Sequence, residues 1–86
     1  MSVERSTLFS HQLKYRVKKS FHSGITSQFL EGEILVFQSY KYSPYDECSV
    51  YEFRNEKGDV KEWWMGDEEM PIAWTENFEE IPARVL

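Results

Sequence analysis

Short runs in which apolar and polar residues alternate recur along the chain, the pattern of strands with one buried face. The clearest run covers residues 13–18 (LKYRVK), where every second side chain is apolar. Residues 34–37 (ILVF) are continuously apolar, which suits a strand covered on both faces. Further strands are expected at residues 49–54 and 60–65. Residues 79–86 can end the fold as an edge strand, where a proline is tolerated.

The segments between these runs contain turn-forming residues. Residues 20–30 predict a long excursion with three apolar anchors, and residues 31–33 (EGE) predict a turn, because glycine adopts positive φ without steric penalty. Residues 39–47 (SYKYSPYDE) are polar and aromatic around a central proline, which predicts a loop. Residues 55–59 (NEKGD) predict a tight hairpin, and residues 73–78 predict a helical turn before the last strand.

Together these elements predict a single domain. The chain has 86 residues, too few for two independent cores. Residues 1–12 show no sustained period and are expected to form a flexible N-terminal tail, which leaves residues 13–86 as the folded domain. Five short strands, a long first loop, a tight distal hairpin and a helical turn predict an all-β fold, namely a small five-stranded antiparallel barrel.

The order of these elements is similar to that of the Src-homology-3-like (SH3-like) barrel. Three strings carry the similarity: residues 14–21 (KYRVKKSF), residues 31–37 (EGEILVF) and residues 77–81 (NFEEI). More narrowly, Tyr-x-Val at 15–17, Gly-Glu at 32–33 and Ser-Pro-Tyr-Asp at 43–46 resemble a small family of bacterial domains of uncharacterised function. The resemblance implies a fold and no activity.

The chain departs from those SH3 domains that bind proline-rich peptides. Such domains carry a tryptophan early in the third strand and acidic residues in the first loop. Here Trp63 and Trp64 follow the distal hairpin, and residues 20–30 contain no acid. The peptide-binding residues of those domains are therefore not transferred to this chain.

Composition favours a cytoplasmic protein with a folded core. Apolar residues make up 41 % of the chain, well above the content typical of disordered proteins. The longest apolar run, at 34–37, falls far short of the roughly 18 residues of a membrane-spanning helix, and the N-terminus shows no apolar signal-peptide core. The single cysteine, Cys48, forms no internal disulfide, which excludes a disulfide-stapled secreted scaffold.

The net charge of −5 is unevenly distributed. Residues 1–43 hold six basic and three acidic residues, whereas residues 44–86 hold four basic and twelve acidic residues. A chain with this balance repels a phosphate backbone, so nucleic acid is a weak candidate partner. A single-stranded nucleic-acid platform would combine basic side chains with stacking rings. The candidates for it are Lys14, Arg16, Lys18, Lys19, Tyr15 and Phe21.

Aromatic residues are the strongest candidates for a binding surface, because tyrosine and tryptophan offer large, rigid contact areas. The candidate partner-binding residues are Tyr40, Tyr42, Tyr45, Trp63, Trp64 and Trp74. The competing interpretation is that these rings fill the core of a small domain. Adjacent strand residues face opposite ways, so one of Trp63 and Trp64 is expected in the core. The other is expected either beneath residues 66–75 or in a binding or dimer surface.

A second candidate surface is acidic. Its residues are Asp67, Glu68, Glu69, Glu76, Glu79 and Glu80. A surface of a single sign steers association with a basic partner. The competing interpretation is a solvated face that is partly neutralised by Lys14, Arg16 and Lys18, since the first and last strands are expected to be neighbours.

The sequence predicts neither catalysis nor a metal site nor a cofactor. His11, His22 and Cys48 do not fall at zinc-ligand spacing. The acids beside Cys48 are expected to raise the pKa of its thiol and disfavour the thiolate, so a buried role at the start of a strand is favoured. The four glycines are scattered and form no phosphate-binding loop.

The expected function is that of a non-catalytic module that binds a protein partner, or a second copy of itself, through the aromatic loop and the tryptophan edge. The first alternative is an acidic inhibitor or immunity-like protein that masks a basic partner. The second alternative is single-stranded nucleic-acid binding. No membrane partner is expected.

Overall fold

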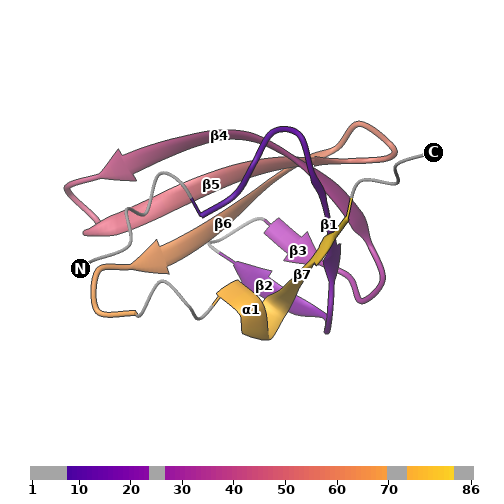
Figure 1. The fold of residues 1–86 in the computed structure, drawn as a ribbon. Helices are drawn as coiled ribbons and strands as arrows, with labels where there is room; N and C mark the ends of the chain where they lie inside the picture. Colours follow the sequence, from indigo (N-terminus) through magenta and orange to yellow (C-terminus); the bar gives the residue numbers. More distant parts are fainter. Residues whose placement is uncertain (1–7, 24–26, 70–73, 83–86) are drawn as a thin grey trace.

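The computed structural model describes residues 8–23, 27–69 and 74–82, more than half of which lie in antiparallel strands (Figure 1). The strands are β1 (Lys14–Val17), β2 (Phe21–Ser23), β3 (Ser27–Phe29), β4 (Ile34–Ser43), β5 (Cys48–Asn55), β6 (Val60–Gly66) and β7 (Phe78–Ile81). One short helix, α1 (Trp74–Asn77), precedes β7. The prediction of an all-β fold with a helical turn before the last strand is therefore confirmed.

Five strands form one sheet in the order β6-β5-β4-β1-β7, and β2 and β3 form a separate two-stranded sheet. The first and last strands pair, as expected, with Arg16 opposite Glu79 and Val17 opposite Phe78. Tyr15 and Val17 face the core while Lys14 and Arg16 are exposed. The alternation read from the sequence thus identifies the buried face of β1 correctly.

Strand β4 is longer than predicted, and the predicted loop at 39–47 is wrong over most of its length. β4 continues to Ser43 and β5 begins at Cys48, so only residues 44–47 form the turn. The register shifts between Phe37 and Ser39, which is a β-bulge. The local composition indicated a loop, but pairing along β5 extends the strand, and the proline falls in the turn where it removes no ladder donor.

Within the excursion predicted at residues 20–30, β2 pairs with β3 in antiparallel fashion, and this pair of strands covers one edge of the large sheet. The side-chain oxygens of Ser23 and Ser27 accept hydrogen bonds from the backbone N–H groups of Trp64 (2.7 Å) and Glu62 (3.0 Å). Both serines are buried. Edge-strand N–H groups need partners when they are covered, and the two hydroxyls supply them along β6.

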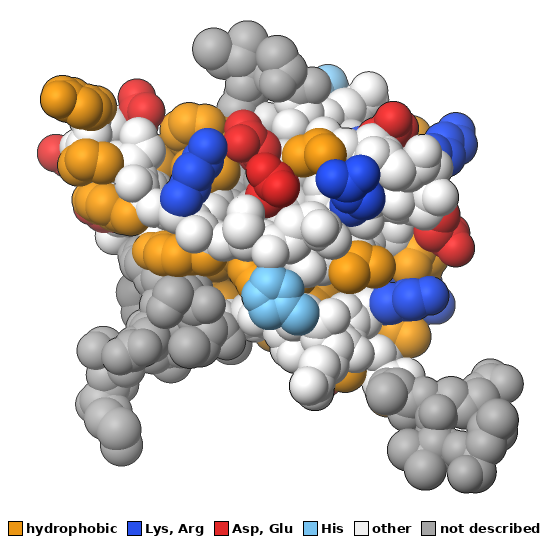
Figure 2. All heavy atoms as spheres, turned by 90° about the horizontal axis from the view of Figure 1, so that it is seen from above, with side chains coloured by type: hydrophobic (Ala, Val, Ile, Leu, Met, Phe, Trp, Pro, Cys, Tyr) orange, Lys and Arg blue, Asp and Glu red, His pale blue; other side chains and the backbone are white. Residues whose placement is uncertain are grey.

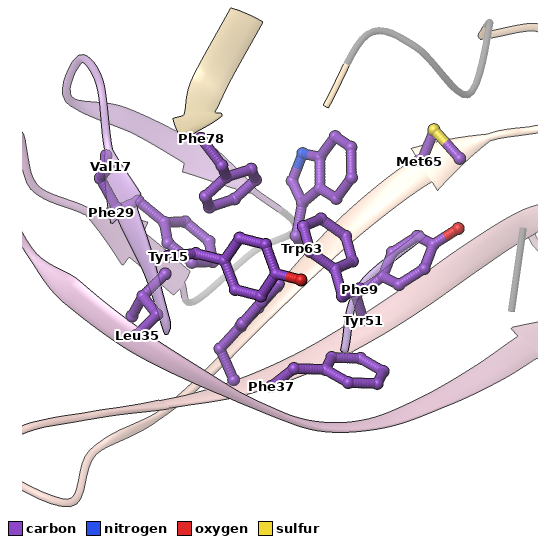
Figure 3. Packing of buried hydrophobic residues seen from close by; sticks show 11 residues of the cluster. Phe9, Tyr15, Val17, Phe29, Leu35, Phe37, Tyr51, Trp63, Met65 and Phe78 are labelled. Atoms are coloured by element: carbon purple, nitrogen blue, oxygen red, sulfur yellow. The ribbon is translucent and has the colours of Figure 1, made fainter. Parts of the chain in front are cut away.

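The core is dominated by aromatic rings, and Phe9 lies at its centre (Figure 3). Its side chain is 5 % exposed. Ring centroids at 4.9–5.9 Å from that of Phe9 belong to Tyr15, Phe37, Tyr51, Phe53, Trp63, Trp74 and Phe78. Most of these contacts are edge-to-face, the arrangement that aromatic quadrupoles favour.

The prediction of a flexible tail over residues 1–12 is corrected for residues 8–12. Besides the burial of Phe9, the backbone N–H of Ser10 donates a hydrogen bond of 2.7 Å to the Tyr15 hydroxyl. Residues 1–7 lie outside the described residues. Leu8 and Phe9 form one short apolar pair between polar residues, which produces no period, so the pattern could not show that Phe9 fills the space over the sheet.

Candidate functional site

Two turns meet at one end of the long strands. Residues 44–47 connect β4 to β5, residues 67–69 follow β6, and the backbone N–H of Asp67 donates to the Glu47 carbonyl at 2.9 Å. Glu47 has a φ of 51°, the left-handed conformation of a tight turn. We call this end the tyrosine tip. Its residues are Tyr42, Tyr45, Asp46, Glu47, Asp67, Glu68 and Glu69.

Two predicted binding residues, Tyr42 and Tyr45, are exposed at the tyrosine tip. The side chain of Tyr45 is 99 % exposed and that of Tyr42 is 46 % exposed. The Tyr42 hydroxyl donates a hydrogen bond of 2.6 Å to Asp67. This bond is the main cause that raises the pKa of Tyr42 to about 12, with desolvation and the negative charges of Asp67 and Glu47 adding to it. Tyr42 is therefore a neutral hydrogen-bond donor at physiological pH.

Tyr40 lies apart from these two tyrosines because the bulge turns it toward the core. Its ring packs against Tyr51 with a centroid distance of 5.2 Å, and its hydroxyl is hydrogen-bonded to Ser49 at 3.3 Å. The side chain is half-buried. Tyr40 therefore supports the sheet beneath the tyrosine tip.

The three predicted tryptophans are divided between core and surface. Trp63 is 4 % exposed in the core, and Trp74 packs over Phe9. Trp64 is half-buried on the opposite face of β6, beside Val50 of β5. Trp63 is thus the core member of the pair. Residues 70–73 of the segment expected to cover the outward ring lie outside the described residues.

The predicted acidic surface is divided in the same way. Asp67, Glu68 and Glu69 belong to the tyrosine tip, whereas Glu76, Glu79 and Glu80 lie on α1 and β7. Arg16 forms an ion pair of 2.7 Å with Glu79, and both side chains are about half exposed. Asp67, Glu68 and Glu69 follow β6, whereas Glu79 and Glu80 lie on β7, and these two strands are opposite edges of the sheet. The six acids therefore do not form one continuous run along a strand.

Figure 2 views the molecule from above Figure 1 and shows hydrophobic side chains scattered among charged ones. Orange hydrophobic side chains project at its left edge beside red carboxylates, on the side where Figure 1 places the turn between β4 and β5. The tyrosine tip thus combines apolar rings with negative charge.

Both candidate stacking rings of the nucleic-acid alternative pack against other parts of the protein, and Phe21 stacks on Phe29 with a centroid distance of 4.8 Å. Tyr15 is buried and its hydroxyl accepts from Ser10, so its face is not available to a base. Arg16 pairs with Glu79, and the Lys18 ammonium donates to the Thr75 carbonyl at 2.9 Å. Arg16 is thus a cross-strand partner of β7, and Lys18 is bound to the backbone of α1.

Cys48 is half-buried at the start of β5, and its thiol donates to the Asp46 carbonyl at 3.2 Å. Burial raises the pKa of this thiol, and the charges of Asp46, Asp67, Glu69 and Glu47 raise it further. The thiolate is therefore disfavoured at neutral pH, in the direction expected from the neighbouring acids.

A buried polar network that the sequence did not predict lies at the other end of β5. Lys61 forms an ion pair of 2.7 Å with Glu33, and their side chains are only 14 % and 11 % exposed. The Asn55 side-chain amide donates to Glu33 at 2.8 Å, and the Leu30 N–H donates at 3.1 Å. No local spacing joins Glu33 to Lys61, because they are 28 residues apart.

This network forms the inner wall of a surface hollow of about 370 Å³ between residues 30–34 and residues 55–61. Burial alone raises the pKa of Glu33, but hydrogen bonds from Lys61, Asn55 and Leu30 outweigh it, so the pKa lies below its usual value. The inner wall is therefore an ionised, internally paired set of groups.

Comparison of the chain with protein-family models, curated proteins and solved structures gives no match. Across residues 8–23, 27–69 and 74–82, no helix has the length and apolar character of a membrane span. In the same ranges, histidine, cysteine and acidic side chains form no group of three that could hold a metal ion.

Proposed function

We propose that the protein is a non-catalytic binding module that docks a protein partner through the tyrosine tip. The observation that carries this proposal is the 99 % exposure of Tyr45 on a turn between two long paired strands. A fully exposed aromatic ring has no role in the core, and aromatic rings are enriched among residues that dominate binding energy.

The proposal includes the SH3-like barrel that the sequence resembles. Two features support it: β1 pairs with β7, and the β2–β3 hairpin docks on β6 through serine hydroxyls. In addition, Trp63 of β6 and Phe78 of β7, which come from the two edges of the large sheet, pack in the same core with ring centroids 5.2 Å apart. Small barrels of this kind have little interior volume for a substrate, which favours a binding role over catalysis.

Hydrogen bonds hold the tyrosine tip in one conformation. The Ser43 hydroxyl donates to Asp46 at 2.8 Å, and the Gly66 N–H donates to Glu69 at 2.8 Å. The bond between Tyr42 and Asp67 joins the two turns. A preordered surface loses less conformational entropy on binding, so the tip is suited to present Tyr45 to a partner.

Replacing Tyr45 by serine is expected to weaken partner binding by about tenfold or more, as for other exposed aromatic hot spots. The melting temperature should not change, because the ring is 99 % exposed. Capture of interacting proteins on immobilised protein, with quantitative mass spectrometry, compares the variant with the parent chain.

The matched control is Val60→Ser, which removes a half-exposed apolar side chain from the start of β6, away from the tip. A partner that is lost with Tyr45→Ser and retained with Val60→Ser supports the tip as the docking surface. Equal capture by both variants would rule it out.

A second candidate function is an acidic inhibitor or immunity-like protein that masks a basic partner. The observation that favours it is the charge of the tyrosine tip. Its carboxylates are those of Asp46, Glu47, Asp67, Glu68 and Glu69. Neither residues 42–53 nor residues 62–69 contain a lysine or arginine to neutralise them.

The two functions differ in their response to salt. Association with a basic partner should slow by roughly tenfold or more between about 50 and 500 mM NaCl, because salt screens attraction between opposite charges. The association rate of a partner that docks mainly through Tyr45 should change little over the same range of NaCl concentration. Stopped-flow measurement of the association rate with the captured partner separates them, and a rate independent of salt would rule out the inhibitor.

A further inference from the structure

The hollow beside the Glu33–Lys61 pair lies at the opposite end of β5 from the tyrosine tip, because the turns before and after a strand lie at its two ends. Two turns form its walls. Residues 31–33 turn into β4 with a φ of 85° at Gly32, and residues 56–59 join β5 to β6 with a φ of 88° at Gly58. The Asn55–Glu33 hydrogen bond joins these walls.

The inner wall has no bonding capacity left for a ligand. The Lys61 ammonium donates to both oxygens of Glu33, at 2.7 and 2.9 Å, and to the Gln28 carbonyl at 2.6 Å. Glu33 also accepts from Asn55 and from the Leu30 N–H. The charges of Glu33 and Lys61 therefore compensate each other. What the hollow can bind depends on the exposed residues around its opening, which we call the rim.

The rim combines apolar side chains with carboxylates. Leu30 is about half exposed, and Ile34 is half-buried beside it. The exposed acids of the rim are Glu31, Glu56 and Asp59, and its one exposed base is Lys57. Within the described part of the chain, Glu31, Glu56 and Lys57 form no ion pair, so the charges of the rim stay open to a ligand.

We infer that the hollow receives the side chain of a lysine from a partner polypeptide. Its aliphatic stem would lie against Leu30 and Ile34, and its ammonium group would be shared among the rim carboxylates. Four carboxylates against two ammonium groups line the hollow, which disfavours anions such as phosphate or a carboxylate. A volume of about 370 Å³ is near the lower end for ligand pockets, sufficient for one long side chain.

Lysine suits this rim better than arginine. The Lys ammonium is a compact point charge on a flexible stem, whereas the Arg guanidinium gains most from a planar, bidentate carboxylate. The buried carboxylate of Glu33 is already occupied by Lys61. Of the remaining acids, Glu31 lies in one turn and Glu56 and Asp59 lie in the other, so carboxylates from both walls can share one point charge.

The test is a titration of the whole chain followed by two-dimensional ¹H–¹⁵N spectra, with the peptide Ac-Gly-Lys-Gly-NH₂ as probe. The norleucine peptide Ac-Gly-Nle-Gly-NH₂ keeps the stem and lacks the charge. We expect weak, saturable binding of the lysine peptide, with Kd on the order of millimolar for so small a ligand. The shifts should be confined to residues 30–34 and 55–61, and the norleucine peptide should bind at least about fivefold more weakly.

Two variants of equal charge locate the binding. Glu31→Gln combined with Glu56→Gln should weaken binding by about fivefold or more, because both rim acids contact the ammonium. Glu76→Gln combined with Glu80→Gln removes the same charge from exposed positions on α1 and β7, outside both the hollow and the tyrosine tip, and should leave Kd unchanged. Equal binding of the norleucine peptide, or equal loss in both variants, would overturn the proposal.

Two further titrations, one with spermidine and one with an arginine peptide, complete the test. Spermidine that binds much more tightly than the lysine peptide would identify a free polyamine as the ligand and overturn the inference. An arginine peptide that binds as well as the lysine peptide would overturn the choice of lysine. Tyr45→Ser should leave the titration unchanged, so this inference and the docking function of the tyrosine tip fail or hold separately.

Discussion

Replacing Phe9 by alanine is expected to lower the free energy of unfolding by about 3–5 kcal/mol, the cost typical of truncating a buried phenylalanine. Phe9 is 5 % exposed, and its ring contacts β1, β4, β5 and β6 together with α1. A domain of this size has roughly 5–15 kcal/mol of stability in total, so the variant should lose a large part of it.

Urea unfolding followed by tryptophan fluorescence measures this loss. Phe9→Leu, which keeps most of the volume, should cost less than about 2 kcal/mol and serves as the graded control. If Phe9→Ala unfolds within about 0.5 kcal/mol of the parent chain, residues 8–12 would behave as the tail that the sequence indicated.

Replacing Lys61 by methionine is expected to lower the free energy of unfolding at pH 7 by about 2–4 kcal/mol, slightly less than is typical for a fully buried pair. The substitution keeps the length of the side chain but leaves the Glu33 carboxylate buried without its cation. Lys57→Met, on the exposed part of the same hairpin, is the matched control and should change stability little.

The contribution of Glu33 to the pH dependence of stability should be smaller in this variant than in the parent chain. In the parent chain the pKa of Glu33 is lowered on folding, so its stabilising contribution is complete above the unfolded pKa of about 4.3. That contribution is lost as the pH falls through the folded pKa. Without Lys61, the pKa of Glu33 is expected to be higher than in the parent chain, because only the hydrogen bonds from Asn55 and Leu30 then oppose the effect of burial, so acidification costs the variant less stability.

Urea titrations between about pH 4 and pH 7 should therefore show the stability deficit of Lys61→Met shrinking as the pH falls. The double variant with Glu33→Gln and Lys61→Met has no buried charge and should recover part of the lost stability. A deficit that is the same at every pH would show that the loss comes from packing rather than from a stranded carboxylate.

The parts of the fold that the sequence predicted depend on close neighbours in the chain. Alternation around Tyr15 identified β1, and the turn at residues 55–59 was predicted from its composition. That turn is closed by Asn55, whose side-chain oxygen accepts from the backbone N–H groups of Lys57 and Asp59. Gly58 adopts the positive φ that only glycine reaches without strain.

The candidate site was predicted only in part, for the same reason. The aromatic loop drew attention to Tyr42 and Tyr45, because both flank a turn signal at the proline, and both side chains are exposed. Tyr40 belongs instead with the core, since the bulge after Phe37 changes which face of β4 it occupies. A bulge depends on the partner strand, and the sequence of β4 alone does not reveal it.

By itself, the sequence determined that the chain is an antiparallel all-β domain with an acidic C-terminal half, since period and composition are readable within a few residues. Only the tertiary structure decided that Phe9 fills the core and that Glu33 meets Lys61. Both depend on contacts between segments far apart in the chain, where shape and charge must match across strands. A side chain's place in the core is set by the space that distant strands leave, and that space has no local signal.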